Sequence, residues 1–99
     1  MNHKIESNNQ PLDVVVIGAG PGGLTAGALL AKAGLKIALI EEQPVVGGYL
    51  AGFSRKGFHF NSSIEWLNEC GPEGIAGKVF AHIDDDVPEF PPMKNIFRV

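Results

Sequence analysis

Asp13-Val-Val-Val-Ile-Gly-Ala-Gly-Pro-Gly-Gly-Leu-Thr-Ala-Gly27 is the part of the sequence that is most informative about the fold. Its β-branched run, Val14 to Ile17, predicts a strand, and a G-x-G-x-x-G pattern begins at the next residue, Gly18. An alanine- and leucine-rich stretch with helical character follows, and a second apolar run, Ile37 to Ile40, leads into an acidic residue. This order of strand, glycine turn, helix, strand and acid is typical of the first half of a dinucleotide-binding unit.

The glycines of this pattern predict a site for a pyrophosphate group. Gly18 allows a sharp turn out of the strand, Gly20 lets the backbone approach the phosphates closely, and Gly23 lets the helix pack tightly on the strand. The pyrophosphate would lie on the unpaired N–H groups and positive dipole end of the helix N-terminus, where a proline is tolerated. The expected phosphate-binding residues are Gly18, Gly20, Pro21, Gly22 and Gly23.

An acidic residue at the end of the second strand is expected to bind a ribose hydroxyl of the cofactor. Glu41 lies 23 residues after Gly18, which is near the spacing typical of such an acid. Glu42 is the competing candidate, and we favour Glu41 because it directly ends the apolar run. A carboxylate here would repel a ribose 2′-phosphate, so NADP is not the expected cofactor.

The composition is ordinary for a globular domain. The chain has 99 residues, 44% of them hydrophobic, and its net charge of −3 argues against nucleic acid as a partner. Its single cysteine, Cys70, cannot form an internal disulfide, which favours a reducing compartment and a cytoplasmic location. The uncharged stretch Val14 to Ala31 is explained better by the glycine fingerprint than by a membrane span.

We therefore expect an α/β fold with a Rossmann-like parallel sheet. It would hold only the N-terminal β-α-β unit of a cofactor-binding domain, followed by short helices. Residues 1–11 are expected to be a disordered leader and residues 12–99 a partial domain with its core at 12–60. Strands are expected at Leu12–Ile17 and Leu35–Ile40, and a further strand is expected to begin at Asn95. Helices are expected at Pro21–Ala33, from Ser62 or Ser63 to Cys70, and at Pro72–Ile83. Gln43–Gly57 is expected to be a glycine-bearing loop that can include a short extended piece.

A second glycine motif, Gly47-Gly48, follows shortly after Glu41. The surrounding sequence resembles FAD-dependent oxidoreductases that carry a double glycine after the second strand, and among them the phytoene desaturase, carotenoid isomerase and retinol saturase group. The resemblance is specific from about Asp13 to Phe60 and so concerns the N-terminal segment of that group. It rests on Leu39-Ile40-Glu41, Gly47-Gly48-Tyr49, Gly52-Phe53-Ser54-Arg55-Lys56-Gly57-Phe58 and Phe60.

The resemblance implies FAD as the cofactor. The first glycine fingerprint and Glu41 would bind the ADP part of FAD, and Gly47 and Gly48 would lie close to the cofactor. A glycine pair lets backbone N–H groups face an anion without obstruction by side chains. Arg55 stands in a basic position that the group often fills, although a solvated pair with Lys56 is an equal alternative. The chain departs from the group where Asn61 replaces an acid and Ser63 replaces a glycine.

The implied activity is FAD-dependent redox chemistry on an apolar, carotenoid- or retinoid-like substrate. Related enzymes work at membranes because their substrates are lipophilic, so attachment to the periphery of a membrane is the alternative to a free cytoplasmic location. Relatives are several hundred residues long, so we expect this chain to be too short for activity alone and to depend on a partner chain or further sequence. An NAD-binding dehydrogenase domain and a truncated, non-catalytic nucleotide-binding fragment remain alternatives.

The other chemically active side chains give no catalytic or metal site. The three histidines lack the spacing to cysteine or acid that metal sites need. His59 alternates with two phenylalanines, which predicts the solvent face of a short strand. Trp66, with Ile64 and Leu67, is expected in the core, with the lining of an apolar substrate entrance as the alternative.

Overall fold

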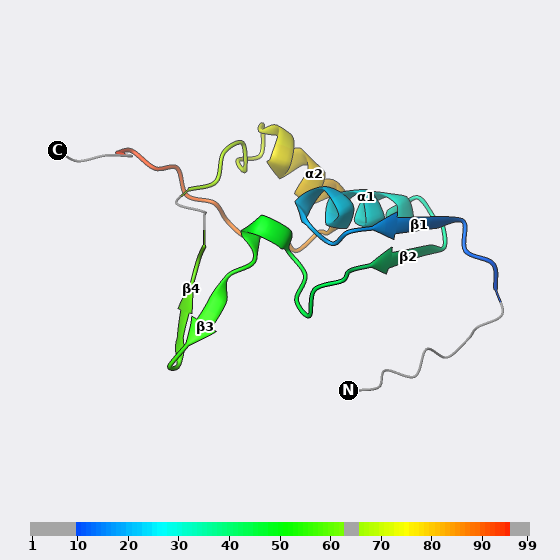
Figure 1. The fold of residues 1–99 in the computed structure, drawn as a ribbon. Helices are drawn as coiled ribbons and strands as arrows, with labels where there is room; N and C mark the ends of the chain where they lie inside the picture. The colour runs from blue at the N-terminus through cyan, green and yellow to red at the C-terminus, as the bar shows by residue number, and fades with distance from the viewer. Residues whose placement is uncertain (1–9, 63–65, 96–99) are drawn as a thin grey trace. The chain divides into compact units, whose positions relative to one another are not determined.

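The computed structural model describes residues 10–62 and 66–95. The chain forms two compact units, of which the first ends at Ser62. The first unit contains β1 (Val14–Ile17), α1 (Pro21–Lys32), β2 (Ile37–Ile40), the short 3₁₀ helix η1 (Gly48–Leu50), β3 (Phe53–Arg55) and β4 (Phe58–Phe60), and the second contains α2 (Ile75–Ile83) (Figure 1).

The predicted β-α-β unit is confirmed. β1 and β2 pair in parallel, with Val14 opposite Ile37 and Ile17 opposite Ile40, and α1 connects the two strands (Figure 1). Each strand begins two residues later than predicted, because hydrogen bonds between Asp13 and Lys36 end the regular pairing of the two strands there. The Lys36 carbonyl accepts from the Asp13 N–H at 2.8 Å, and the Asp13 carboxylate accepts from the Lys36 N–H at 2.7 Å.

One face of this two-stranded sheet is covered by α1, while the other is open. Gly23 and Gly27 bring α1 close to Val16 and Ile37. Side chains alternate between the two faces of a strand, so the residues next to Val16 and Ile37 in each strand lie on the opposite face. They include Val15, Ile17 and Ile40, which are 49%, 85% and 54% exposed. The apolar runs are thus partly uncovered, as a parallel sheet with a single crossover helix requires.

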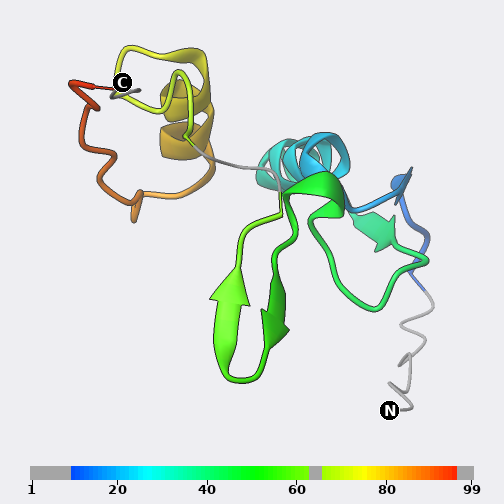
Figure 2. The same cartoon turned by 60° about the vertical axis from the view of Figure 1, so that its left-hand side comes forward.

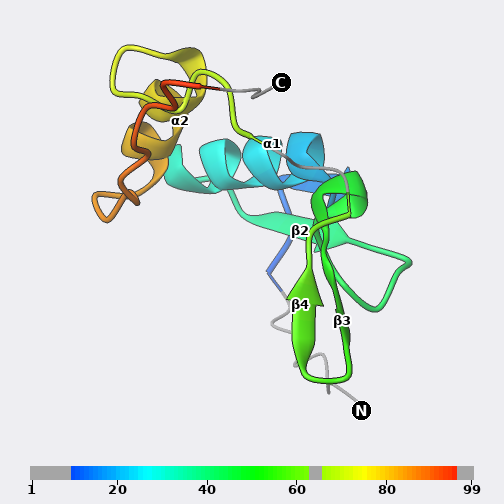
Figure 3. The ribbon, with the colours of Figure 1, turned by 90° about the vertical axis from the view of Figure 1, so that its left-hand side faces the viewer.

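The segment after β2 forms a hairpin where a loop with a short extended piece and a short strand around His59 are predicted. β3 and β4 form an antiparallel hairpin in which Phe53 lies opposite Phe60 (Figure 3). Its two turn residues, Lys56 and Gly57, both have positive φ, which a tight hairpin turn between right-twisted strands requires. A lysine at positive φ is uncommon, so the residue types here do not predict this turn. His59 is exposed in β4, as predicted.

The second unit differs from the prediction before its helix. α2 begins at Ile75 rather than Pro72, and the described residues from Trp66 to Cys70 are not helical. Glu69 has φ 58°, a left-handed conformation that interrupts a helix. The prediction of a helix ending at Cys70 is therefore wrong over its described part, and Ser63, its alternative start, lies outside the described residues.

One further prediction fails in this unit. Trp66 and Leu67 are 37% and 55% exposed, so they do not form a core, and Ile64 lies outside the described residues. Asn95 belongs to no strand, and the residues after it lie outside the described range. The expected leader falls mostly on residues 1–9, which are likewise outside it. Within residues 10–62 and 66–95, no helix has the length and apolar character needed to cross a membrane.

Two glycines of α1 should respond in opposite ways to alanine. A Cβ at Gly23 would overlap the carbonyl oxygen of Gly18, whereas a Cβ at Gly27 would lie 3.5 Å from Ile37 Cδ1, an ordinary contact. We expect Gly27→Ala to stabilise the chain by about 0.5–1 kcal/mol through helix propensity. Gly23→Ala should destabilise it by about 1–3 kcal/mol through overpacking. Urea unfolding followed by far-UV circular dichroism measures both, and equal effects would contradict the packing described.

Candidate dinucleotide-binding site

The first glycine turn leaves the N-terminus of α1 accessible. Gly18 turns the chain with φ 99°, and its N–H donates to the Ile40 carbonyl at 2.7 Å, which joins the ends of the two strands. Gly20 is the N-cap of α1, and no side chain caps this helix. A Cβ at Gly20 would have no protein atom within 4 Å. The first N–H groups of a helix have no partner within it, so this end can accept an anion.

Glu41 lies against this turn. Its Oε2 accepts from the Ala19 N–H at 2.7 Å, and its Oε1 accepts from the Gln43 N–H at 2.9 Å. The bonds from Gln43 and Ala19 hold the pKa of the Glu41 carboxyl below its ordinary value of 4.5, against a small opposing effect of burial. Glu42, the competing candidate, is exposed. The structure therefore brings Glu41 to the predicted phosphate-binding turn, in a charged state.

The double glycine contacts the first glycine turn directly. Gly47 and Gly48 have φ 116° and 57°, conformations that favour glycine, and the Gly47 N–H donates to the Ala19 carbonyl at 2.7 Å. A Cβ at Gly48 would lie 3.1 Å from the Cα of Gly20, so a side chain there would crowd the turn. η1 thus lies beside the N-terminal end of α1 (Figure 2). The two motifs, separated in sequence, form one backbone surface.

Two residues at or near the site, Ala19 and Ser62, were not predicted as site residues. Ala19 is fully buried, its N–H donates to Glu41 and its carbonyl accepts from Gly47. The only sequence feature that could have indicated a role for Ala19 is its position between two glycines. The Ser62 hydroxyl lies 2.9 Å from the Ala51 carbonyl, which fastens the end of the hairpin to the segment that follows η1. It stands within the segment where the sequence departs from the family pattern.

Arg55 is the predicted site residue that lies apart from the two glycine motifs. It lies in β3 opposite Phe58 and is exposed. Within the described residues, no hydrogen bond or ion pair joins it to either glycine motif. The alternative interpretation, a solvated basic pair with Lys56, agrees better with this position in the hairpin.

The bonds to Glu41 predict a pH dependence. Because the pKa of this carboxyl is lower in the folded chain than in the unfolded one, its contribution to stability is fully present above the unfolded value. It is lost as the pH falls through the lowered value. We expect the amide proton shifts of Ala19 and Gln43, followed by NMR, to titrate together below pH 4.5. Glu41→Gln should abolish this titration and Glu42→Gln should leave it unchanged, whereas a transition that survives Glu41→Gln would assign it to another group.

Comparisons with known proteins identify the family of this chain. Residues 16–83 match the family model described as NAD(P)-binding Rossmann-like domain. All-trans-retinol 13,14-reductase of Macaca fascicularis is 33% identical over 91% of this chain. The inactive all-trans-retinol 13,14-reductase of Danio rerio is 43% identical over 64% of it. The 4,4′-diapophytoene desaturase of Methylomonas sp. is 29% identical over 87% of it.

These relatives confirm the predicted resemblance to the retinol saturase and phytoene desaturase group. The aligned parts make up 15%, 11% and 17% of the three relatives, so the chain spans a small fraction of their length. No solved structure matches the chain at a significant level. The family match begins at Val16, within β1, and continues through the glycine turn, β2 and α2. The chain belongs to the family of NAD(P)-binding Rossmann-like domains and contains its dinucleotide-binding β-α-β unit.

Proposed function

We propose that this chain binds FAD as the cofactor-binding segment of an oxidoreductase that acts on an apolar, polyene-type substrate. The contact between Gly48 and Gly20 carries the proposal, because it gives the double glycine a place beside the phosphate-binding turn. An NAD-binding domain of the minimal kind needs only the first glycine motif and the acid. The retinol reductases and the desaturase named above are relatives whose names describe redox chemistry on such substrates.

The described residues fit the ADP part of the cofactor. The uncapped end of α1 would receive the pyrophosphate, with Gly18, Gly20, Pro21, Gly22 and Gly23 around it. Glu41 is held beside this end as a carboxylate and would accept a hydrogen bond from a ribose hydroxyl. The backbone of Gly47 and Gly48 would complete the surface near the phosphates. The flavin itself would supply the hydride chemistry, and the protein the binding and orientation.

Substitution of Gly20 gives a direct test of the phosphate site. Gly20 has an extended backbone conformation, φ −76°, and no protein atom within 4 Å of its Cβ position, so valine can be accommodated in the fold. We expect Gly20→Val to abolish FAD binding in an equilibrium titration because its branched side chain would occupy the space of the pyrophosphate. Unchanged circular dichroism would separate this effect from unfolding. Wild-type affinity for FAD in this variant would place the phosphate site elsewhere.

Substitution of the acid tests the ribose contact. Glu41→Ala should weaken FAD binding by about 1–3 kcal/mol, as expected for the loss of a charged hydrogen-bond partner. Glu42→Ala is the matched control and should bind as the wild type does. A parallel titration with NAD distinguishes the alternative cofactor, since tight NAD binding without affinity for FAD would overturn the proposal.

We also expect residues 1–99 alone to show no oxidoreductase turnover. The roles proposed above concern the ADP half of FAD alone, and we assign no residue of this chain a role at the flavin ring. The assay is the reduction of an artificial electron acceptor in the presence of FAD and all-trans-retinol. Turnover with stoichiometric bound flavin would show that this chain carries the catalytic site as well.

A further inference from the structure

We propose that Ser62 is a positioning residue of the cofactor site. Its hydroxyl holds η1 in place, so that the double glycine, Gly47 and Gly48, stays against the phosphate-binding turn and the cofactor binds with full affinity. This inference rests on the proposed function, because it gives one side chain the task of keeping that site assembled. All the residues concerned lie in the first unit.

η1 has little buried surface to hold it in place. It is a single turn of three residues, and the side chains of Tyr49 and Leu50 are 93% and 46% exposed. The free energy gained from packing scales with the apolar area that is buried, so polar contacts at the two ends decide where this turn lies. Before η1, the contact is the bond from the Gly47 N–H to the Ala19 carbonyl at 2.7 Å.

Ser62 supplies the contact after η1. Its hydroxyl donates to the Ala51 carbonyl at 2.9 Å and lies 3.3 Å from the Tyr49 carbonyl. A serine hydroxyl carries a single proton, so the shorter contact is the main hydrogen bond and the second carbonyl lies within reach of the same proton. Tyr49 belongs to η1 and Ala51 is its C-cap, so this hydroxyl attaches the end of η1 to the end of the hairpin.

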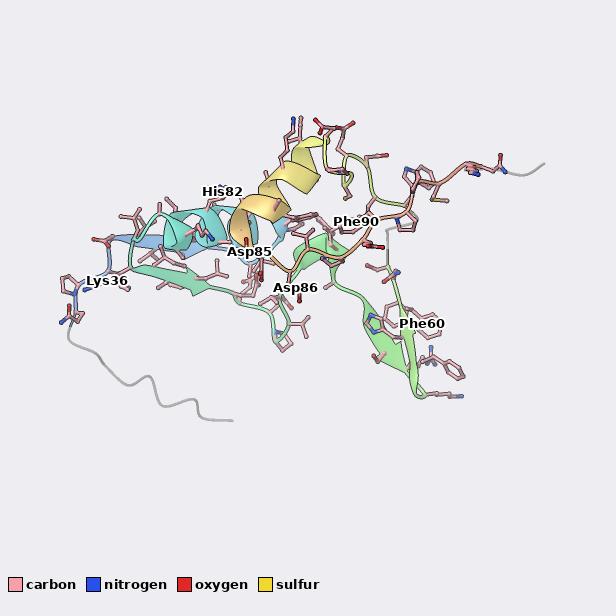
Figure 4. All side chains as sticks on the ribbon, turned by 180° about the vertical axis from the view of Figure 1, so that it is seen from behind. Lys36, Phe60, His82, Asp85, Asp86 and Phe90 are labelled. Atoms are coloured by element: carbon pink, nitrogen blue, oxygen red, sulfur yellow. The ribbon has the colours of Figure 1, made fainter. Side chains whose placement is uncertain are left out.

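The pairing of the hairpin brings Ser62 to this position. Phe53 lies opposite Phe60, and the same antiparallel register continued by two residues places Ser62 opposite Ala51. The rings of Phe53 and Phe60 stack with their centroids 5.2 Å apart, and Phe60 projects from β4 (Figure 4). A stacked cross-strand pair stabilises one register against its alternatives. The register that this pair stabilises is the one that the contact of Ser62 needs.

Gly52 lets the two strands approach each other at this end of the hairpin. A Cβ at Gly52 would lie 2.6 Å from the Phe60 carbonyl oxygen and 2.6 Å from His59 Nε2, which is too close for any side chain. A larger residue would therefore push β4 away from the segment that follows η1. The short Ser62 side chain reaches the Ala51 carbonyl because this close approach is preserved.

The consequence for the cofactor follows from the contact between the two glycine motifs. A Cβ at Gly48 would lie 3.1 Å from the Cα of Gly20, which is the uncapped N-cap of α1. The backbone of the double glycine lines the phosphate site only while η1 keeps this position. A turn that is not held in advance must be ordered when the ligand binds, and this ordering lowers the affinity.

Removal of the hydroxyl tests the role of Ser62 in the full chain. We expect Ser62→Ala to weaken FAD binding roughly three- to tenfold in an equilibrium titration, the range that one hydrogen bond between uncharged groups accounts for. In the flavin-free chain, hydrogen exchange of the Gly47 amide, followed by NMR, should become faster by a similar factor. This amide is bonded to the Ala19 carbonyl while η1 is in place.

Three controls separate positioning from a general loss of stability. The Gly18 amide bonds to the Ile40 carbonyl at the end of the sheet, and its exchange should be unchanged in Ser62→Ala. Ser62→Thr keeps the hydroxyl and should retain the FAD affinity and the Gly47 exchange rate of the wild type. Ser54→Ala removes a hydroxyl of the same hairpin that lies 3.1 Å from His59 Nδ1 instead of contacting η1, and it should behave as the wild type.

Three results would overturn the proposal. They are wild-type FAD affinity in Ser62→Ala, equal acceleration of exchange at Gly47 and Gly18, and equal losses of affinity in Ser62→Ala and Ser62→Thr. The first of these, with FAD bound by the wild type, would leave the proposed function standing. If the wild type bound no FAD but Ser62→Ala accelerated exchange at Gly47 alone, the proposed function would be rejected and the anchoring of η1 by Ser62 would stand.

Discussion

The candidate site depends on the two backbone hydrogen bonds made by Ala19. Its N–H donates to the Glu41 carboxylate and its carbonyl accepts from the Gly47 N–H. One bond joins the first glycine turn to the end of β2, and the other joins it to the double glycine. Since Ala19 is fully buried, leaving either group without a partner would cost free energy of desolvation. These bonds therefore hold three separate segments in one arrangement around the N-terminus of α1.

The same arrangement excludes side chains at Gly48 and Gly23. Gly48 lies against the backbone of Gly20, and Gly23 lies against the carbonyl of Gly18, so the segments can meet only where no Cβ intervenes. Gly20 and Gly22 differ, because the Cβ position of each is open on the protein side. Packing within the chain therefore does not require glycine at either position.

The first unit leaves much apolar surface exposed. Ile17 is 85% exposed on the sheet face opposite α1, and Phe58 is 69% exposed on the hairpin. A parallel sheet is stable when both of its faces are covered. The aligned relatives are several times longer than this chain, since its match covers about 15% of the retinol reductase. Within the described residues, the sheet face opposite α1 therefore lacks the cover that a parallel sheet needs.

Sequence patterns were sufficient to predict the β-α-β unit, the glycine turn and the family. These patterns reflect local geometry. Side chains alternate between the two faces of a strand, a helix ends where a residue such as glycine interrupts it, and the turn out of β1 needs positive φ at Gly18. The choice between Glu41 and Glu42 also followed from position at the strand end. Such features are short in range, so a pattern of neighbouring residues is sufficient to predict them.

The way in which distant segments meet is visible in the three-dimensional structure and not in the sequence. The bonds of Ala19, the contact of Gly48 with Gly20 and the separate position of Arg55 depend on the path of the loop after β2, which no periodicity encodes. The hairpin turn at Lys56 and the left-handed Glu69 were missed because side-chain type disfavours both conformations. In each case, long-range packing overrides a local preference, and sequence patterns report local preference alone.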